Sequence, residues 1–163
     1  LQPMTQYATE WINKTDDYIY TAEALTKNDG EIYSLPWETR CMVLYYRTDI
    51  YGEEPAFKSL QDIVDKAGEH TGDGNYGFVL GCHGDDGFLQ QLTPVLYAFG
   101  ASVYDKNMNI VLNSDEGVKA VEWLRDLYNA GVMDNAAVQM NIEDTFNAMK
   151  AGTAYSIILG SHG

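Results

Sequence analysis

The sequence has few cysteines, few basic residues and no long apolar run. Its 163 residues include 2 cysteines, too few for a disulfide scaffold. Lys and Arg number 10 against 24 Asp and Glu, which gives a formal net charge of −14. Such a field repels phosphate backbones and anionic lipids, so nucleic acids and membrane surfaces are disfavoured as partners. No apolar run approaches the roughly 20 residues of a membrane-spanning helix, and the first residues lack the pattern of a signal peptide.

The composition does supply material for a packed core. Hydrophobic residues make up 45% of the chain and aromatic residues 12%. This predicts one globular domain, or a large piece of one, and argues against intrinsic disorder. Cys41 and Cys82 each lie in an apolar stretch, where a buried free thiol is the commoner outcome. A disulfide between them stays open.

Strand and helix patterns alternate along the chain. Apolar runs predict buried strands at 41–46, 76–80 and 155–159, and a short strand at 31–36. Apolar residues at helical spacing predict helices near 3–13, 57–67, 88–99, 114–130 and 141–151. Pro94 predicts a kink in its helix, or a helix start nearer Thr93. The alternation predicts an α/β fold with a parallel or mixed sheet flanked by helices.

Local signals add detail to two of these helices. Ser59 and Asp62 are spaced as a capping pair, and Ser114 is expected to cap the helix that follows it. The predicted apolar face of that second helix consists of Val118, Val121, Leu124 and Tyr128. Gly131 is expected to end it in a left-handed conformation.

The segment around Asp105 resembles part of a calcium-binding loop. Asp105, Asn107 and Asn109 alternate, and Glu116 follows at the loop's last position. Ile110 stands where such a loop needs glycine for its sharp turn. A hairpin turn is therefore favoured, with two short strands around it, and calcium binding stays open.

A second polar loop follows the apolar run at 76–80. His83, Asp85 and Asp86 could bind a metal, or the two carboxylates could perform acid–base chemistry. Adjacent aspartates do not readily aim at one point, and the other histidines are remote in sequence. A ligand-binding loop at the carboxyl end of a strand is the favoured interpretation.

A third candidate is the loop at 37–40. Trp37 can stack on a sugar ring, while Glu38 and Arg40 can hydrogen-bond its hydroxyl groups. The alternative is a solvated loop with a packed tryptophan, because large aromatic side chains are usually mostly buried.

Five segments form a series of motifs along the chain. Residues 29–36 read DGEIYSLP, similar to D-G-K-x-Y-x-x-P, and residues 43–49 read VLYYRTD, similar to x-L-Y-Y-N-K-D. Residues 58–63, 112–120 and 146–159 continue the series. No single motif is specific, but their order and spacing together resemble the solute-binding proteins of ABC importers, in the extracellular family that includes the maltose-binding proteins.

The resemblance implies a periplasmic-binding-protein-like lobe, part of a two-lobed type II binding fold. Residues 1–36 would end the N-terminal lobe and approach the hinge, and residues 37–163 would form an incomplete C-terminal lobe. Leu1 is no natural start and Gly163 closely follows an apolar run. We therefore expect a piece of a protein roughly two to three times longer.

The resemblance also implies the solute-binding positions. They are Trp37, Glu38, Thr39 and Arg40, then His83, Asp85, Asp86 and Phe88, and finally His162, with Gln90 and Gln91 as further candidates. No catalytic residue, metal or cofactor is implied. Arg40 and His162 keep a carboxylated or phosphorylated sugar open as the solute.

The expected function is capture of an extracellular carbohydrate and its delivery to the transmembrane permease of an ABC importer. The resemblance implies a monomer in the periplasm or on the cell surface as a lipoprotein. The alternatives are a carbohydrate-active hydrolase that uses Asp85, Asp86 or Glu38, and a solute sensor.

Overall fold

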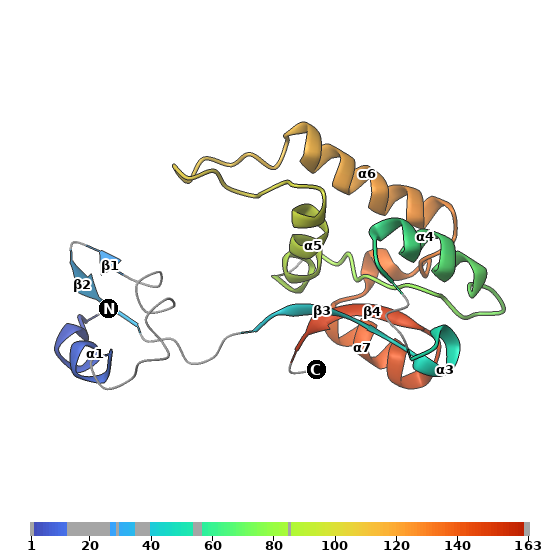
Figure 1. Ribbon diagram of the computed structural model, residues 1–163, viewed down its shortest axis with the longest axis horizontal. Coiled ribbons are helices and arrows are strands. Elements are labelled where there is room, and N and C mark those ends of the chain that lie inside the picture. The colour runs from blue at the N-terminus through green and yellow to red at the C-terminus, as the bar shows by residue number, and fades with distance from the viewer. Residues whose placement is uncertain are drawn as a thin grey trace. The chain divides into compact units, whose positions relative to one another are not determined.

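The computed structural model describes residues 2–12, 27–28, 30–34, 40–53, 57–84 and 86–161 (Figure 1). The chain divides into two compact units, Leu1–Arg40 and Cys41–Gly163. This division lies a few residues beyond the predicted boundary between residues 36 and 37. Assignment of the two units to two lobes stays a prediction.

The described residues of the first unit form a helix and a short hairpin. Its described elements are α1 (Thr5–Ile12), β1 (Lys27–Asn28) and β2 (Glu31–Ile32). β1 pairs antiparallel with β2, and Gly30 between them has a φ of +83°, which glycine adopts without strain. The backbone N–H of Ile32 donates to the Thr5 hydroxyl at 3.0 Å, which ties the start of α1 to β2. The predicted helix at 3–13 is confirmed, while the strand predicted at 31–36 is found over two residues and its end lies outside the described part.

The second unit is a mixed sheet with helices on both faces. Its elements are β3 (Met42–Tyr46), α3 (Thr48–Tyr51), α4 (Leu60–Glu69), α5 (Asp86–Ala98), α6 (Asp115–Asn129), η1 (Ala137–Gln139), α7 (Ile142–Ala151) and β4 (Ser156–Gly160). β3 pairs antiparallel with β4. Residues 76–79 run parallel to β4 on its other side, through the bridges Tyr76 to Ala154 and Val79 to Ile157. The predicted mixed sheet is confirmed, although the predicted strand at 76–80 is present as isolated bridges.

Alternate strand residues pack on opposite faces of the sheet. Phe78, Leu80 and Ile158 join the large core formed with α4, α5 and α6. Val79, Ile157 and Leu159 join a smaller core beneath α7. Figure 1 shows α7 on one side of the sheet and α4, α5 and α6 on the opposite side. The period of two along each strand thus supplies both cores.

The helix ends follow the predicted local signals. The Ser59 hydroxyl accepts from the Asp62 N–H, and the Asp62 carboxylate accepts from the Ser59 N–H, which forms a capping box. Ser114 caps α6 by accepting from the Gly117 N–H, and Gly131 has a φ of +71°. These predicted caps are confirmed.

The predicted face of α6 is right at Leu124, which is buried, and at Tyr128, which packs against the core, but wrong at Val118 and Val121. The buried residues of the helix are Gly117, Ala120, Leu124 and Leu127. Val118 and Val121 are 46% and 49% exposed. A Cβ on Gly117 would stand 2.0 Å from the Leu112 carbonyl oxygen, so only glycine fits at this position. Hydrophobicity alone therefore does not identify the residues of α6 that are buried.

Three further expectations fail in the second unit. α5 includes Pro94 in its interior, so a helix start near Thr93 is wrong. Cys41 is exposed rather than buried, and Cys82 is half-buried, both as free thiols. β3 is less covered than its apolar sequence predicts, because no residue of the strand is buried and Val43 is 36% exposed.

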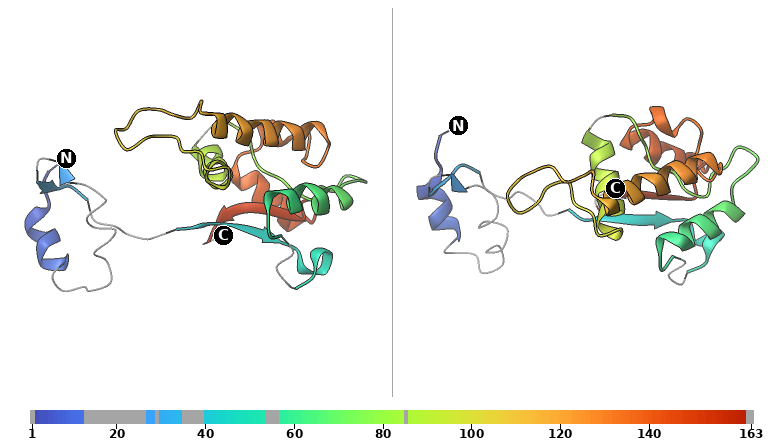
Figure 2. Two further views of the ribbon diagram at one scale, coloured as in Figure 1. Left: turned by 45° about the horizontal axis from the view of Figure 1, so that its top comes forward. Right: turned by 90° about the horizontal axis from the view of Figure 1, so that it is seen from above.

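The connection between α5 and α6 is a hairpin-like loop. Figure 2 shows it projecting from the helices of the second unit. Tyr104 and Ile110 form an antiparallel bridge, so the predicted turn is confirmed but the two predicted strands shrink to one bridge. Among the described residues, no helix combines the length and apolar character needed to cross a membrane.

Candidate functional site

Three segments of the second unit meet at one edge of its sheet. Residues 76–79 and β4 run parallel, so residues 81–84 and Ser161 leave the sheet on the same edge. β3 is antiparallel and therefore begins there, with Met42 opposite Gly160. The Ser161 N–H donates to the Cys41 carbonyl at 2.8 Å. We call this set, Cys41, 81–84 and Ser161, the site edge; carboxyl ends of strands are where open α/β sheets bind ligands.

The described part of the chain includes four of the nine predicted site residues, together with the further candidates Gln90, which is exposed on α5, and Gln91. Arg40 directly precedes Cys41 in sequence and is exposed, and His83 is exposed within the site edge. Phe88 is half-buried and packs against the large core, and Asp86 is the first residue of α5. Trp37, Glu38, Thr39, Asp85 and His162 lie outside the described residues. Their roles as solute contacts remain predictions.

Backbone hydrogen bonds fix the loop that carries His83. The N–H of Cys82 donates to the Ala137 carbonyl at 2.8 Å, and the N–H of His83 donates to the Met140 carbonyl at 3.0 Å. At Gly81, a Cβ would stand 2.7 Å from the Met140 carbonyl oxygen. Only glycine allows so close an approach of two backbones. The loop is therefore held against the segment that begins with η1.

Gln91 faces the protein interior and not a solute. Its side chain is 0% exposed. Its Oε1 accepts from the Gly81 N–H at 3.0 Å, and its Nε2 donates to the Ile158 carbonyl at 2.7 Å and to the Thr145 hydroxyl at 3.2 Å. The expectation that Gln91 contacts the solute is wrong. Its position four residues before the buried Val95 is the sequence signal that could have placed it on the core-facing side of α5.

A cavity that the sequence does not predict lies next to the site edge. It measures about 250 Å³ and is lined by Cys82, Phe88, Val121, Leu124, Arg125, Tyr128, Met133 and Val138. Burial raises the pKa of the Cys82 thiol, which keeps it protonated and poorly nucleophilic. The walls are mainly apolar, so the cavity offers few partners for a hydroxyl-rich solute.

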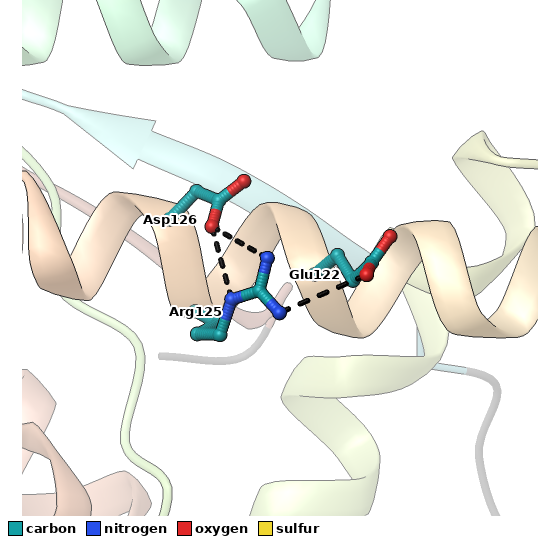
Figure 3. A network of polar contacts seen from close by, with 3 residues as sticks. All are labelled: Glu122, Arg125 and Asp126. Atoms are coloured by element: carbon teal, nitrogen blue, oxygen red, sulfur yellow. Dashed lines mark hydrogen bonds and ion pairs between the residues drawn. The ribbon is translucent and has the colours of Figure 1, made fainter.

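The one cationic group in that lining already has carboxylate partners. Figure 3 shows the Arg125 guanidinium between two acidic residues of α6. Its Nε and Nη2 contact Asp126 Oδ1 at 3.0 and 2.9 Å, and its Nη1 lies 3.7 Å from Glu122 Oε1. These contacts compensate the positive charge, so the cavity gives no clear preference for an anionic ligand.

The Asp105 carboxylate is used inside its own turn. Oδ1 accepts from the N–H groups of Asn107 and Asn109 at 2.8 and 2.9 Å, and Oδ2 accepts from Asn109 Nδ2 at 2.9 Å. The Asn109 side chain, followed by these backbone donors, holds the pKa of Asp105 below its usual value. Glu116 belongs to the first turn of α6. Within the described ranges, no three His, Cys, Asp or Glu side chains gather closely enough to hold a metal ion.

The architecture is that of a lobe of the maltose-binding-protein-like receptors. The model of one family, bacterial extracellular solute-binding proteins, matches residues 1–162. The chain belongs to this family.

Individual relatives agree with this assignment. Maltodextrin-binding protein MdxE of Bacillus subtilis (strain 168) is 28% identical over 138 residues, which cover 76% of this chain and 31% of that protein. Maltose-bound MalE3 of T. maritima is 26% identical, with a TM-score of 0.84 over 98% of this chain and 42% of its own. A solute-binding protein of Thermotoga lettingae TMO bound with alpha-D-tagatose has the same fold, with a TM-score of 0.85 at 24% identity. The chain therefore spans well under half the length of these relatives.

Proposed function

We propose that this protein is the solute receptor of an ABC importer, which captures a carbohydrate between two lobes and delivers it to a transmembrane permease. The observation that carries the proposal is the family match over residues 1–162, joined to relatives named for maltodextrin and maltose. The site edge supports it, since loops that could meet a second lobe leave the sheet there. A monomer in the periplasm or on the cell surface as a lipoprotein fits the extracellular family.

The proposed solute contacts are the residues predicted from the sequence. Trp37 would stack on a sugar ring, and Arg40 and His83 would hydrogen-bond its hydroxyl groups. Phe88 and His162 would add aromatic surface from the second unit. A solute that binds both lobes has a higher affinity for the closed state, and this difference drives closure. No catalytic group is needed for that task.

The test is a thermal-shift screen of the full-length protein. The panel contains maltose, maltodextrins, laminaribiose, tagatose, sugar alcohols and acidic sugars, with amino acids and peptides as the other solute classes. A ligand at 100 times its Kd stabilises the native state by about 2.7 kcal/mol. We expect a carbohydrate to raise the Tm. A shift with another solute class and none with any sugar would refute the carbohydrate assignment.

The same bound sugar separates a receptor from a hydrolase. After prolonged incubation with the protein, chromatography should recover the sugar unchanged. Accumulation of shorter products would favour the hydrolase, with Glu38, Asp85 and Asp86 as the first residues to substitute. A sensor would bind the sugar but would leave uptake intact when its gene is deleted, whereas deletion of an importer's receptor abolishes uptake.

Trp37 offers a direct test of the proposed contacts. Trp37→Ala should weaken binding about fivefold, because loss of aromatic stacking removes on the order of 1 kcal/mol. Trp37→Phe keeps an aromatic face and should lose much less. Calorimetry measures the Kd, and circular dichroism checks that each variant is folded. An unfolded Trp37→Ala protein would identify Trp37 as a core residue instead.

A further inference from the structure

The parallel strand pair changes its bonding pattern where it reaches the site edge. The N–H of Val79 donates to the Ser156 carbonyl at 3.0 Å. In a regular parallel ladder, the next such bond lies two residues further along each strand. That bond would join the N–H of Gly81 to the carbonyl of Ile158.

The Gln91 carboxamide stands between these two groups. It accepts from the Gly81 N–H at 3.0 Å and donates to the Ile158 carbonyl at 2.7 Å. Two hydrogen bonds and an amide group thus span the gap that one hydrogen bond would otherwise close. The side chain satisfies both backbone groups and keeps the two strand ends apart.

Neighbouring contacts fix the carboxamide in this orientation. Its Nε2 also donates to the Thr145 hydroxyl at 3.2 Å, and that hydroxyl donates to the Ile142 carbonyl at 2.7 Å. Gln91 and Thr145 are both 0% exposed. Buried polar groups with all partners in place are rigid, because breaking any bond leaves a desolvated group unpaired. The Gln91 carboxamide is therefore a rigid spacer between the two strand ends.

The spacer lies where two segments of the site edge leave the sheet. One strand end continues through Gly81 to His83, and the other continues from Ile158 to Ser161. The geometry points to Gln91 as a positioning residue of the solute site, which sets the separation of the segments that carry His83 and Ser161. This inference rests on the proposed function, since it assumes that these segments contact the solute.

The test compares Gln91→Met with Ser156→Ala in the full-length protein. Gln91→Met keeps the length and apolar part of the side chain but removes both bonds of the spacer. Ser156 is the matched control, since it is also 0% exposed and bridges the same strands at their other end, through its hydroxyl to the Gly77 carbonyl at 2.6 Å. Both variants lose buried hydrogen bonds, so both should lower the Tm.

Affinity and selectivity of the folded protein are the deciding measurements. The solute is the best ligand of the thermal-shift panel, together with its nearest homologue in that panel. Gln91→Met should raise the Kd for the best ligand about tenfold or more. It should also change the ratio of that Kd to the Kd for the homologue, because supporting residues fix the site geometry. Ser156→Ala should leave both values within about twofold of wild type. Gln91→Asn, which shortens the same carboxamide by one methylene, replaces Gln91→Met if that protein does not fold.

Each other outcome has a definite meaning. If the Gln91 variants bind like Ser156→Ala, the positioning role is overturned and Gln91 is a purely structural residue. If wild type binds a solute that is not a carbohydrate, the proposed substrate class fails while the Gln91 comparison is made with that solute. If wild type binds no solute of any class, both proposals are overturned.

Discussion

The two ends of the strand pair formed by residues 76–79 and β4 are built in opposite ways. At the end near Gly77, the two strands and α4 pack closely, and the Gly77 carbonyl accepts from the hydroxyls of Ser156 and Tyr51 at 2.6 and 2.9 Å. At the site edge, the Gln91 carboxamide holds the strands apart. One end is closed by backbone contact, and the other is spaced by a side chain. At the site edge, the carboxamide satisfies the Gly81 N–H and the Ile158 carbonyl, which the open strand ends would otherwise leave without these partners.

Aromatic packing strengthens the closed end. Tyr51 and Phe57 pack edge to face with ring centroids 4.8 Å apart, and Tyr46 meets Phe57 at 5.5 Å. The His70 ring lies 5.1 Å from Tyr51 in a similar arrangement. Such pairs contribute beyond the area they bury. The closed end therefore has the features of a stability element, whereas the site edge carries the proposed solute contacts.

The largest effect is expected from a substitution at Gly77, in the closed end. In Gly77→Ala, the new Cβ would stand 2.0 Å from the Ala67 carbonyl oxygen, so the strand or α4 must move. We expect a loss of about 3 kcal/mol in the free energy of unfolding, as in other overpacked sites. Urea unfolding followed by circular dichroism measures it.

A glycine at the site edge provides the control. A Cβ on Gly84 would meet nothing within 4 Å, and its φ is not in the left-handed region. Gly84→Ala should therefore change stability by no more than about 0.5 kcal/mol. Equal losses in the two variants would show that close packing at Gly77 does not distinguish the closed end.

The positions of most elements could be predicted because local physics fixes them. The capping box of Ser59 with Asp62 and the left-handed Gly131 use contacts within a few residues, which the sequence shows directly. The strands could be predicted from their apolar runs. Their pairing partners could not, because a strand pattern does not specify its neighbour.

The errors concern which residues of a helix face the core. In α6, Gly117 and Ala120 are buried while Val118 and Val121 are exposed, so hydrophobicity does not identify the buried positions. Gln91 was a candidate solute contact through the family resemblance, but its partners Gly81 and Ile158 are distant in sequence and place its side chain in the core. The resemblance to a family indicated the site loops. The meeting of Cys41, residues 81–84 and Ser161 at one edge follows from the strand pairing, which the sequence does not show.

A smaller effect is expected from removal of the Tyr51 hydroxyl at the closed end. Tyr51→Phe removes the hydroxyl that donates to the Gly77 carbonyl at 2.9 Å, while Ser156 still donates to the same oxygen. The expected loss at neutral pH is about 1 kcal/mol. Tyr97→Phe, at a side chain 64% exposed on α5, is the control and should change stability little.

The contribution of Tyr51 to the free energy of unfolding should also depend on pH. Burial raises its pKa from 10.0 to about 12. Since the folded-state pKa is raised, the contribution to stability is complete below pH 10 and is lost as pH rises through about 12. The stability difference between wild type and Tyr51→Phe should therefore shrink between pH 10 and 12. A constant difference over that window would contradict the burial of this phenol.

The smallest effect is expected in the exposed turn that contains Asp105, away from both the closed end and the site edge. Asp105 accepts three hydrogen bonds within the hairpin between α5 and α6, so Asp105→Ala should loosen that turn and destabilise the protein less than Tyr51→Phe. Its folded-state pKa lies below 3.8, so its contribution is present above that pH and disappears as pH falls through the lowered value. The difference in stability between wild type and Asp105→Ala should thus vanish in acid, as followed by unfolding at several pH values.

Solute affinity of Asp105→Ala should stay unchanged, because the turn is separate from the site edge. A weakened Kd in this variant would extend the solute site beyond that edge, and a calcium-dependent rise in Tm that Asp105→Ala abolishes would assign the turn to a metal.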